Sequence, residues 1–278
     1  MDLDIDTVRV ARTREDCVLL PGEAFLGGGT YLYSEPVPAG VTGLVDLTGM
    51  GWEPWSVDGA GLRVAGTCTL EQLVSGPGAL GAHTGGPYRA LGLVAPCVSA
   101  LTLSAKVARM ATVGGNLALG LPAGSMVGLF AALDAVAVIW TRGVSTSGGG
   151  SRVVAVADLV TGAGAVDLAP GEVLREVRVP SAMLAQRTVF RRASLSSTGR
   201  TAAMVTGRAG GQGPTITVTA SVSAPLSLRA RDHAAVDRWI DRLDSTGAWF
   251  EDVHGSRDWR AAMTRQLAHE ALDELAGT

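Results

Sequence analysis

Two glycine clusters carry the residue types and spacing best suited to binding chemistry in this sequence. One is residues 27–30 (GGGT), directly after an apolar segment, and the other is residues 112–116 (TVGGN). Glycine lets successive peptide N–H groups turn toward one point with no Cβ in the way, and the resulting concave array of donors can bind a pyrophosphate. Thr30, Thr112 and Asn116 add short polar side chains. Two tight turns are the alternative interpretation of the same residues.

Patterns for metal binding, hydrolysis and P-loop chemistry are absent from the sequence. There is no G-x-S-x-G elbow and no G-x-x-x-x-G-K loop. A formal G-x-G-x-x-G occurs at residues 76–81, but it follows a predicted helix and precedes no helix start, so we interpret it as a turn. The histidines lack the spacing of a metal site; they are His83, His233, His254 and His269.

The cysteines indicate reduced thiols. Cys17, Cys68 and Cys97 are an odd number at wide spacing, which suits neither a disulfide framework nor a C-x-x-C metal site. Any iron–sulfur cluster that works with this chain is therefore expected in another chain.

The composition predicts a folded protein without affinity for polyanions. With 278 residues and 47% hydrophobic side chains, the chain can bury the cores of two or three compact units. The formal charge of -3 offers no basic field to nucleic acid or to anionic lipid. The sequence has no apolar run of about 18 residues that would predict a transmembrane helix. An acidic start at residues 1–6, without a secretory signal, favours a cytoplasmic location.

The elements that position the glycine clusters alternate between strands and helices. Residues 1–55 are expected to form a small α/β unit, and residues 61–66 (GLRVAG) follow as a strand. Thr69 and Gln72 fit a capping box that opens a short helix. A further helix is expected at about 96–105.

Periodicity predicts one more helix and a strand pair in this first half. Residues 136–140 and 153–156 are expected to pair as strands, with the glycines at 148–150 as a flexible hairpin tip. Residues 122–133 should form a helix whose buried face contains Met126, Leu129, Phe130 and Leu133.

A second domain is predicted to begin with strands and end with two helices. Residues 172–180 (EVLREVRVP) and 215–222 alternate as strands, with a glycine-rich turn at 207–213 before the latter. Helices are expected at 232–243 and 256–275. In the last helix an i, i+4 stripe predicts core packing, and it consists of Trp259, Met263, Leu267 and Ala271.

The two glycine clusters and the segments around them resemble one protein family. LGGGTYL (26–32) is similar to the family's A-G-G-T/H-x-L loop, and MATVGGNLA (110–118) is similar to its A-T-x-G-G-N/D signature. The family is the FAD-binding subunit of molybdenum hydroxylases, which includes carbon monoxide dehydrogenase medium subunits and the xanthine dehydrogenase flavin domain. The resemblance runs from about residue 13 to 278 through further segments in the family's order: VDLTGM (45–50), GLRVAGTCTLEQL (61–73), LFAALDAVAVI (129–139), LAPGEVLREVRVP (168–180) and HGSRDWRAAMTRQLAHEAL (254–272).

The resemblance implies an α+β fold and a flavin site. A PCMH-type FAD-binding domain would span 1–165, with two α/β subdomains of about 1–55 and 56–165, and a C-terminal antiparallel sheet with helices would span 166–278. The glycine loops would hold the pyrophosphate and the ribityl chain of noncovalent FAD, Leu174 would line the isoalloxazine, and Arg191 would replace a family lysine near its polar edge. The full set implied is Gly27, Gly28, Gly29, Thr30, Tyr31, Leu32, Thr112, Val113, Gly114, Gly115, Asn116, Ser125, Leu174 and Arg191.

Two segments depart from the family pattern. Residues 122–125 (PAGS) stand where the family has P-x-S-D, so the Ser125 hydroxyl replaces a carboxylate. Residues 195–200 (LSSTGR) lack the basic then acidic pattern that the family often has beside the flavin. The Ser125 contact and the electron acceptor are therefore left open.

The function implied by the resemblance is electron transfer within a heteromeric complex. An iron–sulfur small subunit would deliver electrons that a molybdenum-cofactor large subunit extracts from a substrate, and this chain would pass them from FAD to an external acceptor. Two alternatives remain at this point. One is a self-contained FAD-dependent oxidase or dehydrogenase of the same superfamily, and the other is a scaffold subunit that binds FAD weakly.

Overall fold

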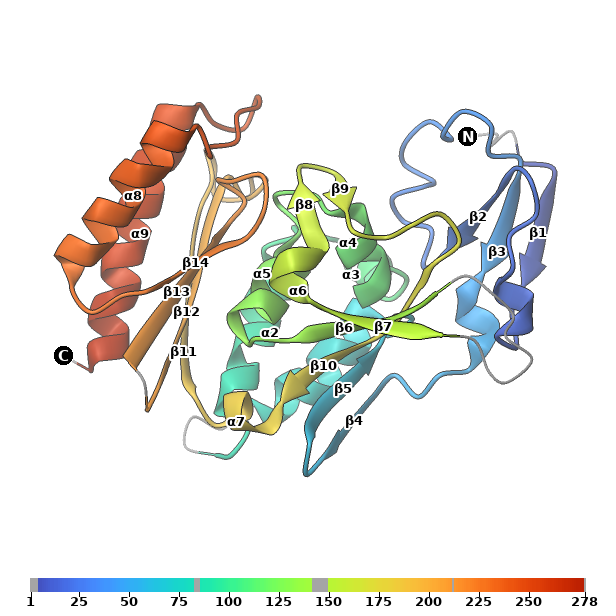
Figure 1. Ribbon diagram of the computed structural model, residues 1–278, viewed down its shortest axis with the longest axis horizontal. Coiled ribbons are helices and arrows are strands. Elements are labelled where there is room, and N and C mark those ends of the chain that lie inside the picture. Colours follow the sequence, from blue (N-terminus) through green and yellow to red (C-terminus); the bar gives the residue numbers. More distant parts are fainter. Residues whose placement is uncertain (1–4, 83–85, 142–149, 212, 278) are drawn as a thin grey trace.

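Three β-sheets lie side by side in this chain. The computed structural model describes residues 5–82, 86–141, 150–211 and 213–277. A three-stranded N-terminal sheet, a five-stranded central sheet and a four-stranded C-terminal sheet follow one another along the longest axis of the molecule (Figure 1).

The N-terminal unit is a small parallel sheet. It contains β1 (Thr7–Val10), β2 (Glu23–Leu26) and β3 (Gly43–Asp46) in the order β1-β3-β2, with short 3-10 helices at Glu15–Cys17 and Leu47–Met50. Arg9 Nε of β1 lies 2.7 Å from Glu23 Oε1 of β2, so an ion pair joins the two edge strands.

The central unit is an antiparallel sheet whose buried side chains pack with several short helices in one core. The strands, in spatial order, are β4 (Trp55–Asp58), β5 (Gly61–Ala65), β10 (Val173–Pro180), β6 (Val136–Trp140) and β7 (Ser151–Ala155). The other elements are α1 (Leu70–Leu73), a π turn at Val74–Gly78, a 3-10 helix at Arg89–Leu93, α2 (Val94–Ser99), α3 (Ala105–Ala108), α4 (Val113–Leu119), α5 (Ser125–Ala132), α6 (Val156–Leu159), and the hairpin of β8 (Val160–Gly162) and β9 (Ala165–Val166).

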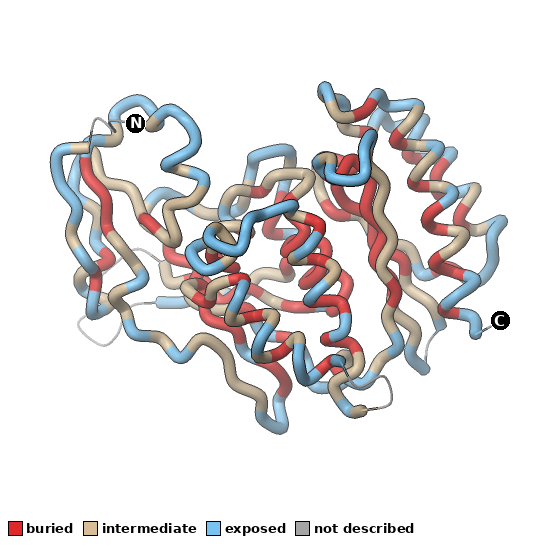
Figure 2. Tube along the Cα trace, turned by 180° about the vertical axis from the view of Figure 1, so that it is seen from behind, coloured by how far each residue is buried: buried red, intermediate tan, exposed pale blue. Residues whose placement is uncertain are grey.

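Several local predictions are confirmed in this unit. Thr69 and Gln72 form the capping box that opens α1. The strand pair of β6 and β7 forms as predicted, although residues 148–149 of the expected hairpin tip lie outside the described residues. Helix α5 buries the predicted face, and Figure 2 shows buried segments running through this centre of the molecule.

The strand at 172–180 belongs to the central sheet, not to the C-terminal one. Strand β10 lies between β5 and β6, and its side chains Leu174, Val177 and Val179 join the central core. The change from one core to the next therefore comes after Pro180, later than the expected division at 165/166. Alternation identified the strand correctly, but it carries no information on which sheet supplies the partners.

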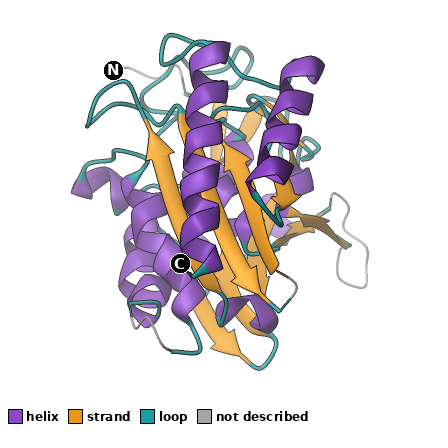
Figure 3. Cartoon of the chain, turned by 90° about the vertical axis from the view of Figure 1, so that its left-hand side faces the viewer, coloured by secondary structure: helices purple, strands orange, loops and turns teal. Residues whose placement is uncertain are grey.

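The C-terminal unit is an antiparallel sheet with two long helices on one face (Figure 3). After the short helix α7 (Ser181–Leu184), it consists of β11 (Arg187–Ala193), β12 (Ala203–Gly210), β13 (Gly213–Thr219), β14 (Leu226–Arg229), α8 (His233–Thr246) and α9 (Arg257–Ala276). The opposite face packs on α5, where Thr206 Oγ1 donates to Gly128 O at 3.3 Å. This contact joins the C-terminal sheet to the central unit.

Two helix and turn predictions differ from the structure. The helix after Pro96 ends at Ser99, and the chain adopts a left-handed conformation at Thr102 (φ 53°) before α3 begins. Residues 76–81 are not an isolated turn, because Gly76 and Pro77 lie in a π turn that continues α1. Proline has no N–H to give to a regular helical bond, which favours the wider turn.

Two predictions in the C-terminal unit also need correction. The glycine-rich turn is shorter than 207–213, since β12 continues through Gly210. In α9 the buried face includes Arg260 and Thr264, whereas Trp259 and Met263 are only partly buried. A stripe of apolar residues alone does not predict the burial of Arg260, because a charged side chain is expected on the solvent side.

Candidate functional site

Both glycine clusters open onto one cavity of about 520 Å³ next to the N-terminal and central sheets. The first cluster follows the end of β2, and the second begins α4, whose N-cap is Thr112. Of the residues that the sequence assigned to the cofactor, those lining this cavity are Gly27, Gly28, Gly29, Thr30, Tyr31, Leu32, Thr112, Gly115 and Asn116.

The first cluster packs closely against Thr112 of the second cluster and against Met110, just before it. A Cβ at Gly28 would stand 1.5 Å from Met110 O, and a Cβ at Gly27 would stand 2.8 Å from Thr112 Oγ1. Any side chain at position 28 would therefore separate the loops. Glycine is required here because of this close approach.

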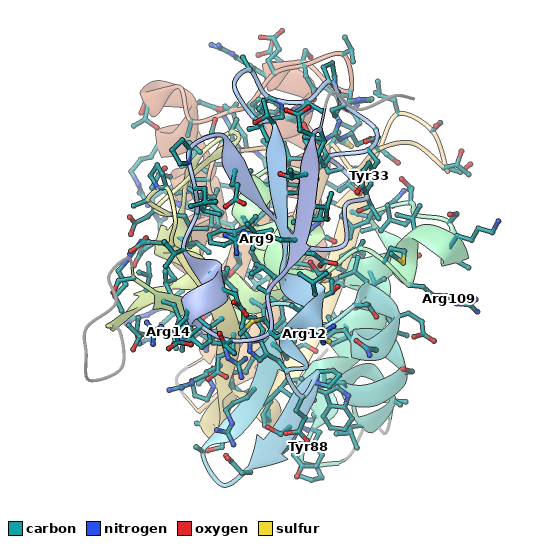
Figure 4. All side chains as sticks on the ribbon, turned by 90° about the vertical axis from the view of Figure 1, so that its right-hand side faces the viewer. Arg9, Arg12, Arg14, Tyr33, Tyr88 and Arg109 are labelled. Atoms are coloured by element: carbon teal, nitrogen blue, oxygen red, sulfur yellow. The ribbon has the colours of Figure 1, made fainter. Side chains whose placement is uncertain are left out.

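The first cluster presents a run of unpartnered amide groups on the cavity wall. Within the described chain, the N–H groups of residues 27–32 donate no hydrogen bond. The next amide, that of Tyr33, donates to Gly29 O at 2.9 Å, and the loop turns at Gly29 with φ +70°. Tyr33 on this turn is labelled in Figure 4. Successive free donors on a concave wall fit the oxygens of a pyrophosphate.

The second cluster does not contribute a comparable donor array. Four of its five amides are used inside the protein: Val113 N–H donates to Cys68 O, Gly114 N–H to Gly66 O, Gly115 N–H to Thr112 Oγ1, and Asn116 N–H to Thr112 O. It supplies space instead. A Cβ at Gly115 would meet only Thr112 Oγ1, at 3.0 Å, and would otherwise occupy the cavity.

Asn116 is the polar side chain of the second cluster that lines the cavity beside Thr112. Its Oδ1 accepts a hydrogen bond from Met126 N at 3.2 Å, which fixes the amide group at the start of α5. Its Nδ2 has no hydrogen-bond partner among the described residues and remains available to a ligand.

Five of the residues that the sequence assigned to the cofactor lie away from the cavity wall. Val113 and Gly114 are buried behind it. Ser125 is fully buried and donates to Cys97 O, and Leu174 is part of the central core. Arg191 forms ion pairs with Glu270 and Glu274 of α9. The structure therefore does not bring Ser125, Leu174 or Arg191 to the glycine loops.

Other cavity residues were not found from the sequence. Apolar side chains from separate segments complete the wall, among them Pro36, Pro38, Val41, Leu70, Leu101, Leu103 and Val107. No short motif joins them, because they come together only through the fold. Glu35 is the one charged residue among the described residues that line the cavity.

The thiols are not poised for reaction with a ligand. Burial raises the pKa of Cys68 to about 12, and burial also raises the pKa of Cys97. No histidine or cysteine occurs among the described residues that line the cavity. This wall therefore offers neither a histidine nor a cysteine for covalent attachment of a flavin.

Comparison with known proteins identifies the family. The family model described as the FAD binding domain in molybdopterin dehydrogenase matches residues 21–182, which is more than half of the chain. The chain therefore belongs to this family. No curated protein sequence matches it significantly.

Solved structures show the same fold over the whole chain. The carbon monoxide dehydrogenase of Oligotropha carboxidovorans is 21% identical, with a TM-score of 0.79 over 97% of this chain and 96% of that chain. Quinoline 2-oxidoreductase from Pseudomonas putida 86 is 20% identical, with a TM-score of 0.78 over 99% and 98%. Carbon monoxide dehydrogenase from Hydrogenophaga pseudoflava is 20% identical, with a TM-score of 0.81 over 98% of each chain. The expected α+β fold is confirmed.

The described residues form neither a membrane-spanning helix nor a metal site. No described helix is both long and apolar enough to cross a membrane. No group of three or more His, Cys, Asp or Glu side chains in the described part of the chain could hold a metal ion.

Proposed function

We propose that this chain binds FAD noncovalently at the cavity between the two glycine clusters. The observation that carries the proposal is the run of free amides at residues 27–32 on the wall of a 520 Å³ cavity. These amides and the Thr30 hydroxyl would hold the pyrophosphate. Gly115 would leave room for the cofactor, and the Asn116 side-chain amide would donate to it.

The proposed role of the bound flavin is electron transfer in a molybdenum hydroxylase complex. FAD supplies redox chemistry that exchanges electrons one or two at a time. The residues of this chain bind and orient it, and the mostly apolar wall excludes water from it. Membership of the family supports this role, as does the likeness in fold to chains of carbon monoxide dehydrogenase and quinoline 2-oxidoreductase.

The proposed partners are an iron–sulfur small subunit and a molybdenum-cofactor large subunit. The described residues contain no ligand set for a metal, so both other redox centres would belong to those partners. A lasting assembly of this kind buries at least about 1,000 Å² at each interface. Apolar side chains that are exposed in the single chain, such as Met110 and Leu195, are available for such contacts.

Co-expression of the chain with the genes next to its own tests the proposal. Native mass spectrometry, with flavin and metal analysis of the same peak, should find one FAD per copy of this chain in a complex that also contains iron and molybdenum. The isolated chain should bind FAD but oxidise no small substrate. A monomer that never co-purifies with partners and oxidises a small molecule alone would support a self-contained oxidase instead. A complex that contains this chain without flavin would support a scaffold role.

A further inference from the structure

A β-bulge in β10 lies directly behind the second glycine cluster. The pairing of β10 with β6 shifts register between Leu174 and Glu176, so Arg175 is the extra residue. Its carbonyl oxygen accepts a hydrogen bond from Gly66 N–H at 2.9 Å. A bulge of this kind changes the direction of its side chain and bends the strand locally.

The Arg175 side chain packs on two tryptophans from different units. Its Cζ lies 4.2 Å from the ring centroid of Trp52, which follows the N-terminal sheet, and 5.9 Å from that of Trp140, at the end of β6. The two rings meet edge to face, 5.3 Å apart. The Cζ of Arg14, which belongs to the N-terminal unit and is labelled in Figure 4, lies 4.6 Å from the centroid of the Trp140 ring. The Arg175 guanidinium therefore joins the N-terminal and central units, which border the cavity.

The surroundings of Arg175 disfavour its positive charge. Burial lowers the pKa of Arg175, and the neighbouring cations Arg178 and Arg63 lower it further, against an opposing effect of Glu176. Glu176 lies 3.6 Å from Arg175 but only 2.6 Å from Arg178, so the closer ion pair is with the exposed arginine. The stacking on two indole faces offsets the loss of water.

A chain of close backbone contacts leads from the bulge to the cavity. A Cβ at Gly66 would stand 2.2 Å from Leu174 O, and a Cβ at Gly114 would stand 2.6 Å from Gly66 O. Gly114 N–H donates to Gly66 O at 2.8 Å, and Gly115 follows on the cavity wall. Because no side chain separates these layers, a shift of the bulge moves the wall with it.

We infer that Arg175 is a positioning residue for the FAD site: its packing on the rings of Trp52 and Trp140 fixes the bulge that supports Gly66, Gly114 and Gly115. The inference rests on the proposed FAD function. Arg175 does not line the cavity, and it acts by setting the distance between the amides of the first cluster and the wall at Gly115.

The test uses the full chain and three variants. Arg175→Met removes the guanidinium and keeps the length of the side chain, and Arg175→Lys keeps the charge without the planar group. Arg178→Met is the matched control, since Arg178 lies on the same strand and pairs with the same carboxylate but does not stack on the tryptophans. For each protein, calorimetry gives the FAD dissociation constant, visible circular dichroism reports the surroundings of the bound flavin, and thermal unfolding of the apo protein gives its stability.

The expected result is a change at the flavin that stability does not explain. Arg175→Met should weaken FAD binding about tenfold and alter the visible circular dichroism of the flavin. Arg175→Lys should weaken FAD binding about threefold. Arg178→Met should change neither FAD binding nor the dichroism. If Arg175→Met does not fold, the Arg175→Lys result decides. Unchanged FAD binding and dichroism in folded Arg175 variants would overturn the inference, even if they unfold at lower temperature. Failure of the wild-type chain to bind FAD would instead overturn the proposed function and the inference with it.

Discussion

Gly28 and Met110 approach so closely that a Cβ at position 28 would stand 1.5 Å from the Met110 carbonyl oxygen. This contact holds the first glycine cluster against the segment that leads into the second. A methyl group there must push the two loops apart, because the clashing atom belongs to the backbone. The width of the cavity thus depends on the absence of a side chain at one position.

We therefore expect Gly28→Ala to weaken both the fold and FAD binding. The overpacking should lower the free energy of unfolding by about 1–3 kcal/mol. Urea titration of the apo protein measures this loss, and flavin fluorescence measures binding. Gly59→Ala is the control, because a Cβ at Gly59 meets nothing within 4 Å. Equal behaviour of the two variants would show that the loops are not in contact in solution.

Gly115→Ala should separate cofactor binding from stability. Its Cβ would meet only Thr112 Oγ1, at 3.0 Å, and would occupy cavity space, so the fold should survive while FAD binding weakens about tenfold. Gly114→Ala should behave differently, because its Cβ would stand 2.6 Å from Gly66 O and would destabilise the fold itself. Titration calorimetry and thermal unfolding of both variants check the contrast. If Gly115→Ala binds FAD with full affinity, the pyrophosphate does not lie against this wall.

FAD should leave the protein when the chain is denatured. The described cavity wall contains no histidine or cysteine, and burial raises the pKa of Cys68 to about 12, which keeps that thiol protonated. After denaturation and ultrafiltration, the yellow chromophore should appear entirely in the filtrate. Flavin that stays with the polypeptide would show a covalent bond to another residue type.

The sequence predicted some local features of the fold because they depend on neighbouring residues. The capping box of Thr69 and Gln72 and the strand pair of β6 and β7 need only local spacing. The position of β10 between β5 and β6 depends on partners that are more than 30 residues away, which spacing does not encode.

The roles of the two glycine clusters could not be distinguished from the sequence. Both contain consecutive glycines, and both predict a donor array by the same argument. Only the structure shows that Gly114 and Gly115 use their amides internally, whereas those of residues 27–32 are free. The resemblance assigned Arg191 to the polar edge of the flavin, and in the structure this side chain forms ion pairs with Glu270 and Glu274 of α9.

The ion pair between Arg9 and Glu23 should make the N-terminal unit sensitive to acid. The hydrogen-bonded Arg9 guanidinium holds the pKa of Glu23 below its usual value of 4.5. A carboxyl whose folded-state pKa is lowered contributes stability that is complete above 4.5 and is lost as the pH falls through the lowered value. Glu23→Gln should therefore lower the free energy of unfolding most at neutral pH and least in acid.

Urea unfolding of wild type and Glu23→Gln, at about pH 7 and at a series of lower pH values that starts at 4.5, measures this difference. The difference in the free energy of unfolding between the two proteins should shrink as the pH falls from 4.5 through the lowered pKa of Glu23. A difference in unfolding free energy that stays constant with pH would show that the variant acts by packing and not through the charge of Glu23.

Arg260 should be the side chain of α9 whose loss most destabilises the C-terminal unit. It is 1% exposed, and its guanidinium donates to Gly255 O at 3.0 Å and to Ala202 O at 2.6 Å, with further bonds to Ala220 O and Asp252. One side chain thus joins α9 to the start of β12 and to the end of β13, which lie at the same end of the sheet.

Arg260→Met keeps much of the side-chain volume but removes every one of these donors. Buried carbonyls and the Asp252 carboxylate then lose their partner, so the free energy of unfolding should fall by about 3 kcal/mol. Arg257→Met is the matched control on the same helix, because Arg257 is 62% exposed and its pair with Glu251 should contribute less than about 1 kcal/mol. Urea titration of both variants provides the comparison. A loss in Arg260→Met no larger than in Arg257→Met would mean that water replaces the guanidinium, and that the buried network does not hold α9 on the sheet.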